Sequence, residues 1–174
     1  MKKRFMLSAA GASVAAIAGS TSADIVVNID EVSLLGGEAV FVDLGAVSGS
    51  LSGIGYSYAW SNNTGDSSWS SDMLIGVSGG GTVVSVGGYN LSFGGISWGG
   101  LNGGPSTGSY SGMASGSAVN MSGAAGFYLY NGWSSSGGIT TSGTYTLYGL
   151  NAVPAPGALA LLGLAGMATR RRRS

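Results

Sequence analysis

The chain contains no cysteine and no histidine, and its basic residues are confined to its two ends. Without cysteine it has no disulfides, no thiolate nucleophile and no cysteine-based metal site. Without histidine it lacks the commonest general base and metal ligand. Between Ala23 and Gly157 there is no lysine or arginine either. This interval therefore has no arginine clamp for phosphate and no basic surface for nucleic acid.

The formal net charge of zero hides a strict separation of charges along the chain. Lys2, Lys3 and Arg4 lie at its start, four arginines lie at its end, and all seven acidic residues fall between Ala23 and Gly157. A basic start, an apolar run, an acidic middle, a second apolar run and a basic stop are typical of an exported protein with a sorting signal at each end. The acidic middle also repels DNA and anionic lipid headgroups.

The N-terminal segment has the three parts of a secretory signal peptide. An apolar run from Phe5 to Ala18 follows the basic residues, and small residues continue to Ala23. We predict a signal helix in residues 1–23 and cleavage between Ala23 and Asp24, with a cut after Ser20 as the alternative. An uncleaved transmembrane anchor is the competing interpretation, although the run is shorter than the roughly 20 residues that cross a bilayer.

The C-terminal segment, residues 153–174, combines a Pro-x-Pro sequence, a short apolar run and an arginine cluster. Its defining residues are Val153, Pro154, Ala155, Pro156, Arg170, Arg171, Arg172 and Arg173. A helix can begin only after the prolines, and residues 157–169 would give about 20 Å of helix. Because a bilayer core is about 30 Å thick and the arginines oppose translocation, we expect this segment to hold the protein in the membrane only transiently.

These C-terminal residues resemble the PEP-CTERM sorting signal of bacterial exported proteins. The resemblance implies processing by an exosortase-like enzyme at the inner membrane, and association with the cell surface or an extracellular polysaccharide matrix. Ala155 stands where the family has a central glutamate, which leaves open whether this tail is cleaved. An ordinary tail-end transmembrane helix is the alternative.

The middle of the chain, residues 24–152, is rich in glycine and serine but also carries the aromatic and branched apolar residues that a core needs. Its apolar residues alternate with a period of two, as in Val40, Val42 and Leu44, which is typical of strands. Clusters of Gly, Ser and Asn predict the turns between them. Strands are expected at residues 25–29, 40–44, 54–60, 73–77, 82–86, 90–93, 96–98, 127–130 and 144–147. The pattern predicts one all-β domain, an antiparallel β-sandwich of jelly-roll type, between the two terminal helices.

A second resemblance concerns this middle domain. The segment Trp69 to Ile75, the block Gly126 to Trp133 and the strand Gly143 to Leu147 resemble secreted jelly-roll modules related to proprotein-convertase P domains. The resemblance implies a jelly roll over much of residues 50–150. An unrelated Gly/Ser-rich bacterial β-sandwich is the alternative.

Asp66 and Asp72 are the candidate metal ligands. They flank a loop rich in serine, and hard carboxylate, carbonyl and hydroxyl oxygens of this kind can hold calcium. The alternative is a solvated turn in which Asp66 caps local backbone donors. The sequence predicts no other cofactor.

Tyr128, Tyr130 and Trp133 are the candidate carbohydrate contacts. The two tyrosines alternate with Phe127 and Leu129, and Trp133 follows in a turn-rich stretch. Aromatic side chains exposed on one face would form a binding platform, whereas cross-strand packing is the alternative. We therefore expect an exported, non-enzymatic cell-surface or matrix protein with a structural or adhesive role. A carbohydrate-binding module is the second interpretation and a secreted hydrolase the third, because the scattered acids identify no catalytic pair.

Overall fold

A computed structural model of the chain describes residues 12–16, 24–62, 72–87, 95–99, 107–132 and 138–154. The strands are β1 (Ala12–Ala16), β2 (Ile25–Leu34), β3 (Ala39–Asn62), β4 (Met73–Gly79), β5 (Thr82–Gly87), β6 (Ile96–Ser97), β7 (Thr107–Asn131) and β8 (Ile139–Ala152). They form one eight-stranded sheet in the order β1-β2-β8-β3-β7-β4-β5-β6. Neighbouring strands are antiparallel except for β5 and β6, which pair in parallel.

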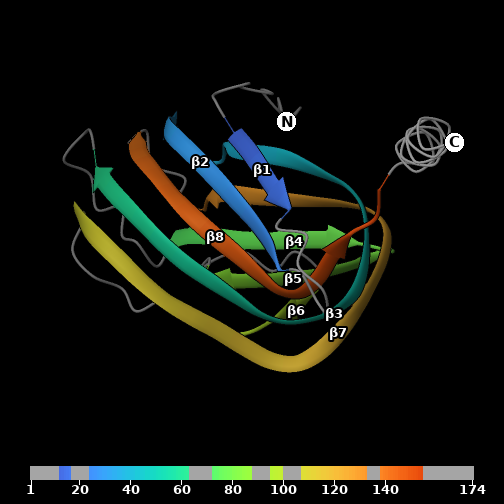
Figure 1. Cartoon of the computed structure of the whole chain (residues 1–174). Coiled ribbons are helices and arrows are strands. Elements are labelled where there is room, and N and C mark those ends of the chain that lie inside the picture. The colour runs from blue at the N-terminus through green and yellow to red at the C-terminus, as the bar shows by residue number, and fades with distance from the viewer. Residues whose placement is uncertain are drawn as a thin grey trace, which may run out of the picture.

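The two longest strands, β3 and β7, bend sharply and so run through both halves of the sheet (Figure 1). Their mutual register shifts at two points, between Asp43 and Gly45 and between Leu51 and Gly53. Gly45 and Gly49 have φ values of 69° and 131°, which glycine adopts far more readily than other residues. Bulges of this kind increase the local twist and bend a strand. They explain why one continuous sheet turns back on itself.

The bend divides the sheet into two arms that face each other. We call the first the front arm: β1, β2, β8, the C-terminal half of β3 and the N-terminal half of β7. The back arm contains the N-terminal half of β3, the C-terminal half of β7, and β4, β5 and β6. In Figure 1 the strands β2 and β8 lie across β4 and β5. One cluster of buried apolar residues contains side chains from both arms.

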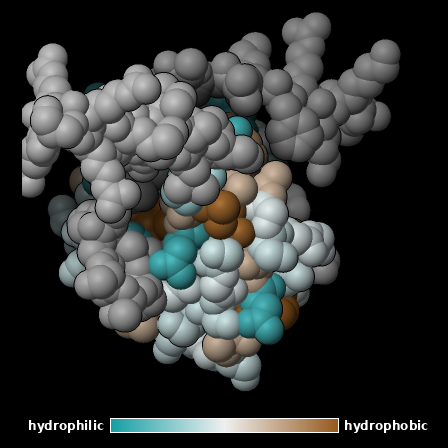
Figure 2. Space-filling model, turned by 45° about the vertical axis from the view of Figure 1, so that its right-hand side comes forward, coloured by the Kyte–Doolittle hydropathy of each residue, from teal (hydrophilic) through white to brown (hydrophobic). Residues whose placement is uncertain are grey.

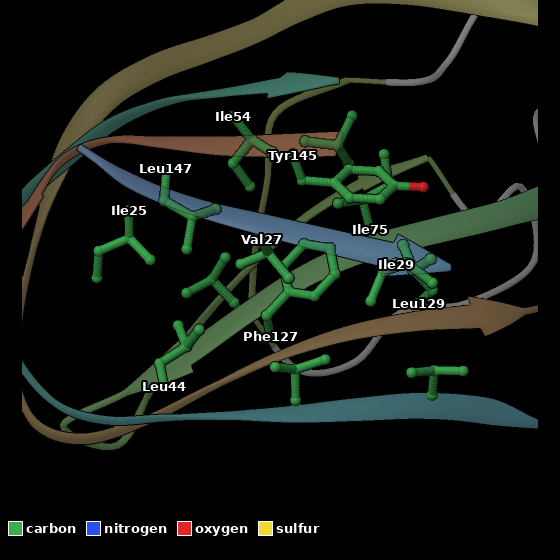
Figure 3. Packing of buried hydrophobic residues seen from close by; sticks show 14 of the residues in the cluster. Ile25, Val27, Ile29, Leu44, Ile54, Ile75, Phe127, Leu129, Tyr145 and Leu147 are labelled. Atoms are coloured by element: carbon green, nitrogen blue, oxygen red, sulfur yellow. The ribbon is translucent and has the colours of Figure 1, made fainter. Parts of the chain in front are cut away.

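The centre of this core is a contact between Phe127 of the back arm and Tyr145 of the front arm. Their ring centroids are 5.0 Å apart with the planes tilted by 43°, and both side chains are fully buried. Val27 and Ile75 lie beside them (Figure 3). A third ring, that of Tyr58, stacks against Tyr145 with centroids 6.5 Å apart. Because each buried aromatic side chain removes about 150–250 Å² from water, this cluster holds the arms together without any disulfide.

The prediction of an all-β domain is confirmed, and no α-helix occurs within the described residues. The described strands belong to one mixed sheet, whereas the predicted sandwich would have two antiparallel sheets. Five residues of the expected signal helix form a strand, β1, along the edge of β2. An extended segment gains backbone hydrogen bonds at such an edge, which offers unpaired donors and acceptors. The expected C-terminal helix lies outside the described residues.

The strands are longer than the sequence predicts because many glycines lie within strands and not only between them. Residues 40–44 and 54–60 were expected as two strands but belong to the single strand β3, and residues 107–126 of β7 were not expected as strand. The glycine cluster between β4 and β5 is a turn, as predicted. Gly80 and Gly81 have φ values of 58° and 79°, and two positive φ values are typical of the two-residue turn that joins hairpin strands.

Candidate binding face

Tyr128 and Tyr130 lie on the outer face of the back arm. Their neighbours in β7, Phe127 and Leu129, are fully buried on the opposite face, whereas both tyrosines are half-buried. The strand therefore separates the two pairs in the way that its alternation predicts. Trp133, the third candidate carbohydrate contact, lies outside the described residues.

Phe41 of β3 is directly paired with Tyr128 and shares its face. Its side chain is 52% exposed, between the buried Val40 and Val42. We call Phe41, Tyr128 and Tyr130 the aromatic face. Together they place aromatic surface across two adjacent strands of the back arm.

Glycines of neighbouring strands allow these rings to lie close against the sheet. A Cβ at residue 76 would lie 2.1 Å from Cζ of Tyr128, and a Cβ at residue 126 would lie 2.3 Å from Cε2 of Phe41. Each ring therefore covers a glycine instead of standing away from the sheet. A ring held in this way keeps one side against the backbone and leaves its other side for a ligand. The burial of Tyr128 also raises the pKa of its hydroxyl.

Asp43 adds a carboxylate to the same face, two residues beyond Phe41 in β3. It is exposed, and its Oδ1 accepts a hydrogen bond from the backbone N–H of Gly45 at 2.8 Å. That bond holds the carboxylate at the bulge, where its remaining lone pairs face solvent. Aromatic rings beside a hydrogen-bond acceptor suit a ligand that has both C–H surfaces and hydroxyl groups.

A shallow depression lies on the outer face of the front arm, across β2, β8, β3 and β7. It has a volume of about 320 Å³, and the polar residues on its lining are Glu31, Ser61, Thr107, Ser109, Thr140 and Ser142, with the buried Thr141 between them. Trp60 also lines it, but its side chain belongs to the core and is only 2% exposed. The depression offers hydroxyl groups and one carboxylate but no exposed aromatic ring from its described lining.

The structure describes one of the two candidate calcium ligands. Asp72 is buried, with 6% of its surface exposed, and its backbone oxygen accepts a hydrogen bond from Gly132 N–H at 3.0 Å. Asp66 lies outside the described residues. Within the described part of the chain, no three Asp, Glu, His or Cys side chains come close enough to hold a metal ion.

The described residues include Asp24 at the first predicted processing site and Val153 and Pro154 at the second. The backbone N–H of Gly149 donates to Oδ1 of Asp24 at 2.9 Å, which ties the first residue of the predicted mature chain to β8. At the other end Val153 N–H donates to Ala46 O at 2.8 Å, and Val153 and Pro154 are exposed. Ala23, Ala155, Pro156 and the arginines 170–173 lie outside the described residues.

No family model and no curated protein matches this chain. None of the described residues forms a helix with the length and apolar character needed to cross a membrane.

Phe41 and Asp43 were not identified as candidates from the sequence. The alternation that assigns Val40, Val42 and Leu44 to the core also assigns Phe41 and Asp43 to the opposite face. This alternation places Phe41 on the outer face but does not indicate which residue of another strand lies opposite it. The pairing of Phe41 with Tyr128 depends on the bulge after Asp43, which the sequence does not reveal.

Proposed function

We propose that this chain is an exported protein of the bacterial cell surface or extracellular matrix, with a structural or adhesive role carried by residues 24–152. The observation that carries the proposal is that β2 begins and β8 ends beside the two predicted cuts. Asp24 is hydrogen-bonded to Gly149, and Val153, directly after β8, is hydrogen-bonded to Ala46. Cuts before Asp24 and beyond Val153 would leave β2 through β8 whole.

The C-terminal tail is the proposed sorting device. The folded strand β8 stops at Ala152, and exposed Val153 and Pro154 lead into the Pro-x-Pro sequence. A processing enzyme embedded in the membrane, of the exosortase kind, would meet an extended and accessible segment at this point. The arginines 170–173 would keep the tail at the inner membrane until it is cut.

The mature domain is proposed to act by assembly or adhesion and not by catalysis. Residues 24–152 contain no lysine, arginine, histidine or cysteine, which leaves few groups for acid–base or nucleophilic chemistry. The described surface in Figure 2 is largely pale, with few strongly hydrophilic or hydrophobic areas. Such a surface suits close packing in a matrix. We also infer that the two facing arms form the layers of a sandwich-like domain, in keeping with the jelly-roll resemblance.

Cell fractionation tests the exported role. Wild-type protein should be found at the surface or in the medium. Replacing the arginines 170–173 by serine should release full-length protein to the medium, because the positive stop is what opposes translocation. Wild-type protein that stays in the cytoplasm would overturn the proposal. A variant that is still sorted and cut like wild type would overturn the proposed action of the tail.

Carbohydrate binding is the second candidate function, favoured by the aromatic face. Phe41 and Tyr128 lie paired against glycines with Asp43 beside them, which provides a flat apolar surface next to a hydrogen-bond acceptor. Extracellular polysaccharide is the ligand class that this chemistry fits. The half-buried state of both tyrosines limits the area that a sugar could cover.

A glycan array with the purified protein, with and without calcium, tests this second function. Phe41→Ala and Tyr128→Ala should abolish any signal. Tyr148→Ala is the matched control, because Tyr148 also lies against a glycine, Gly55, but in the front arm. A Cβ at residue 55 would lie 3.0 Å from Cε2 of Tyr148. No wild-type signal, or equal loss in all three variants, would exclude the aromatic face as a sugar site.

A further inference from the structure

The N-terminal edge of the sheet is occupied by a segment that the proposed processing removes. Strand β1 pairs with β2 from Ala12↔Ile29 to Ala16↔Ile25, and β8 pairs with the other side of β2. Within the described part of the chain, no other strand lies on that side of β2. A cut before Asp24 would therefore separate β1 from the domain and open the edge of Ile25–Ile29. The inference below rests on this cut.

This edge lacks the features that protect open strands. Residues 25–29 carry no charge and no proline, although charges, prolines and bulges are the usual means of blocking an edge. Asp30 and Glu31 come only at the irregularity between Ile29 and Val32. Ile25, Val27 and Ile29 are all buried, so the open edge would lie directly against the core.

We propose that in the processed protein a second copy of this chain takes the place of β1. The two β2 strands would pair antiparallel about a twofold axis at Val27, with Ile25 of each copy opposite Ile29 of the other. This is the register that β1 already shows, where Val14 stands opposite Val27. Because side chains alternate along a strand, Ile25, Val27 and Ile29 of both copies would fall on the core side. The result is one sheet that continues through two molecules.

The flanking acids determine how far this pairing extends. With Val27 on the axis, Asp24 of one copy comes opposite Asp30 of the other, and like charges directly opposite are destabilising. The ladder should therefore stop at Ile29, where β2 itself becomes irregular. Salt screens such a repulsion between exposed groups. The dimer should consequently become stronger as ionic strength rises.

The test uses the full chain with a specific protease site inserted between Ala23 and Asp24. Sedimentation velocity should show a monomer before cleavage and a concentration-dependent dimer after cleavage. Hydrogen exchange at Ile25–Ile29 should slow as the cleaved protein is concentrated. Val26→Lys should abolish the dimer, because Val26 lies on the edge strand. Thr146→Lys is the matched control, since Thr146 is the partner of Val26 in β8 and lies one strand further in.

Each outcome bears on one proposal. A cleaved wild type that stays monomeric, or that retains the segment 1–23 in native mass spectrometry, would overturn the proposal that a second copy takes the place of β1. A cleaved Val26→Lys variant that still dimerises, with circular dichroism matching that of Thr146→Lys, would overturn the proposed edge. Exported protein that still carries residues 1–23 would overturn the processing instead, whatever the cleaved protein does in solution.

Discussion

The ring of Tyr128 lies across Gly76 of the neighbouring strand, so close that a Cβ at residue 76 would stand 2.1 Å from its Cζ. The same arrangement joins Phe41 to Gly126 and Tyr56 to Gly112, where the nearest approaches would be 2.3 and 2.7 Å. Glycine normally weakens a strand because it has no side chain to pack. Here the ring of a neighbouring strand occupies the space that a side chain would fill.

Alanine at these glycines should destabilise the fold by an amount that depends on what lies against it. At Gly76 the obstacle is a ring that can rotate toward solvent, so Gly76→Ala should cost about 1–2 kcal/mol. At Gly143 a Cβ would lie 2.7 Å from the backbone oxygen of Ser57 and 2.6 Å from Cβ of Tyr58. Gly143→Ala should therefore cost more, about 3 kcal/mol or above. Urea unfolding measures both changes.

A double-mutant cycle provides the control for Gly76. In a Tyr128→Ala background, Gly76→Ala should lose most of its cost, because the ring that it displaces is gone. Gly81→Ala serves as a second reference, since its φ is +79° and nothing lies within 4 Å. It should cost about 1 kcal/mol from backbone strain alone. Equal costs at Gly76 with and without Tyr128 would contradict the proposed contact.

Much of the fold could be predicted from the sequence where buried and exposed residues alternate. Strands β2, β4 and β5 carry branched apolar residues, and each begins where it was expected, although β2 runs five residues further. The N-terminal half of β7 has no such signal, because most of its side chains are small and exposed. Its residues are strand because β3 pairs with them along their length. That tertiary cause is not visible in a local pattern.

The candidate sites were predictable to different degrees for similar reasons. The outer position of Tyr128 and Tyr130 follows from period-two alternation alone. The partner residue Phe41 follows from the pairing of strands that are far apart in sequence and from the bulge between Asp43 and Gly45. A shift of one residue in that register would turn a side chain to the other face.

Alkaline pH should unfold the protein through its buried tyrosines. Burial raises the pKa of Tyr145, with a further contribution from nearby Tyr58. The folded state therefore resists ionisation of Tyr145, whereas a tyrosine in the unfolded chain has the usual pKa of about 10. Stability should be unaffected by this group below that pH and should fall as the pH rises above it. Urea unfolding at pH 8 and pH 11 checks this, and Tyr145→Phe should lose less stability between the two values.

Removing the carboxylate of Asp24 should loosen the start of β2. Its Oδ1 accepts the backbone N–H of Gly149, and a hydrogen bond to a charged group contributes about 1.5–3 kcal/mol. Asp24→Ala should lower the free energy of unfolding by about 1–2 kcal/mol, while Asp24→Asn, which keeps an acceptor oxygen, should lose less. Asp30→Ala, at an exposed position of the same strand, is the control. An equal fall in the free energy of unfolding in Asp24→Ala and Asp30→Ala would show that the hydrogen bond from Gly149 adds no stability.

Calcium should bind the Asp66–Asp72 loop only weakly. Two carboxylates leave most of the six to eight oxygen ligands to backbone, hydroxyl and water. We expect calorimetry to give a dissociation constant no tighter than about 10⁻⁴ M, and Asp72→Asn to remove the calcium-dependent rise in melting temperature. Because Asp72 is buried, the variant must be compared with and without calcium at equal folded fraction. No heat on adding calcium and no change in melting temperature, or binding that survives Asp66→Asn and Asp72→Asn together, would contradict the site.

The intact mass of the protein recovered from the cell surface or the medium tests the central claim most directly. An exported and processed domain predicts a chain that begins at Asp24, or at Thr21 if the alternative cut is used, and ends between Val153 and Pro156. Both ends then coincide with the limits of strands β2 to β8, beside the hydrogen bonds of Asp24 and Val153. A mass that corresponds to the uncut chain from Met1 to Ser174 would contradict the claim.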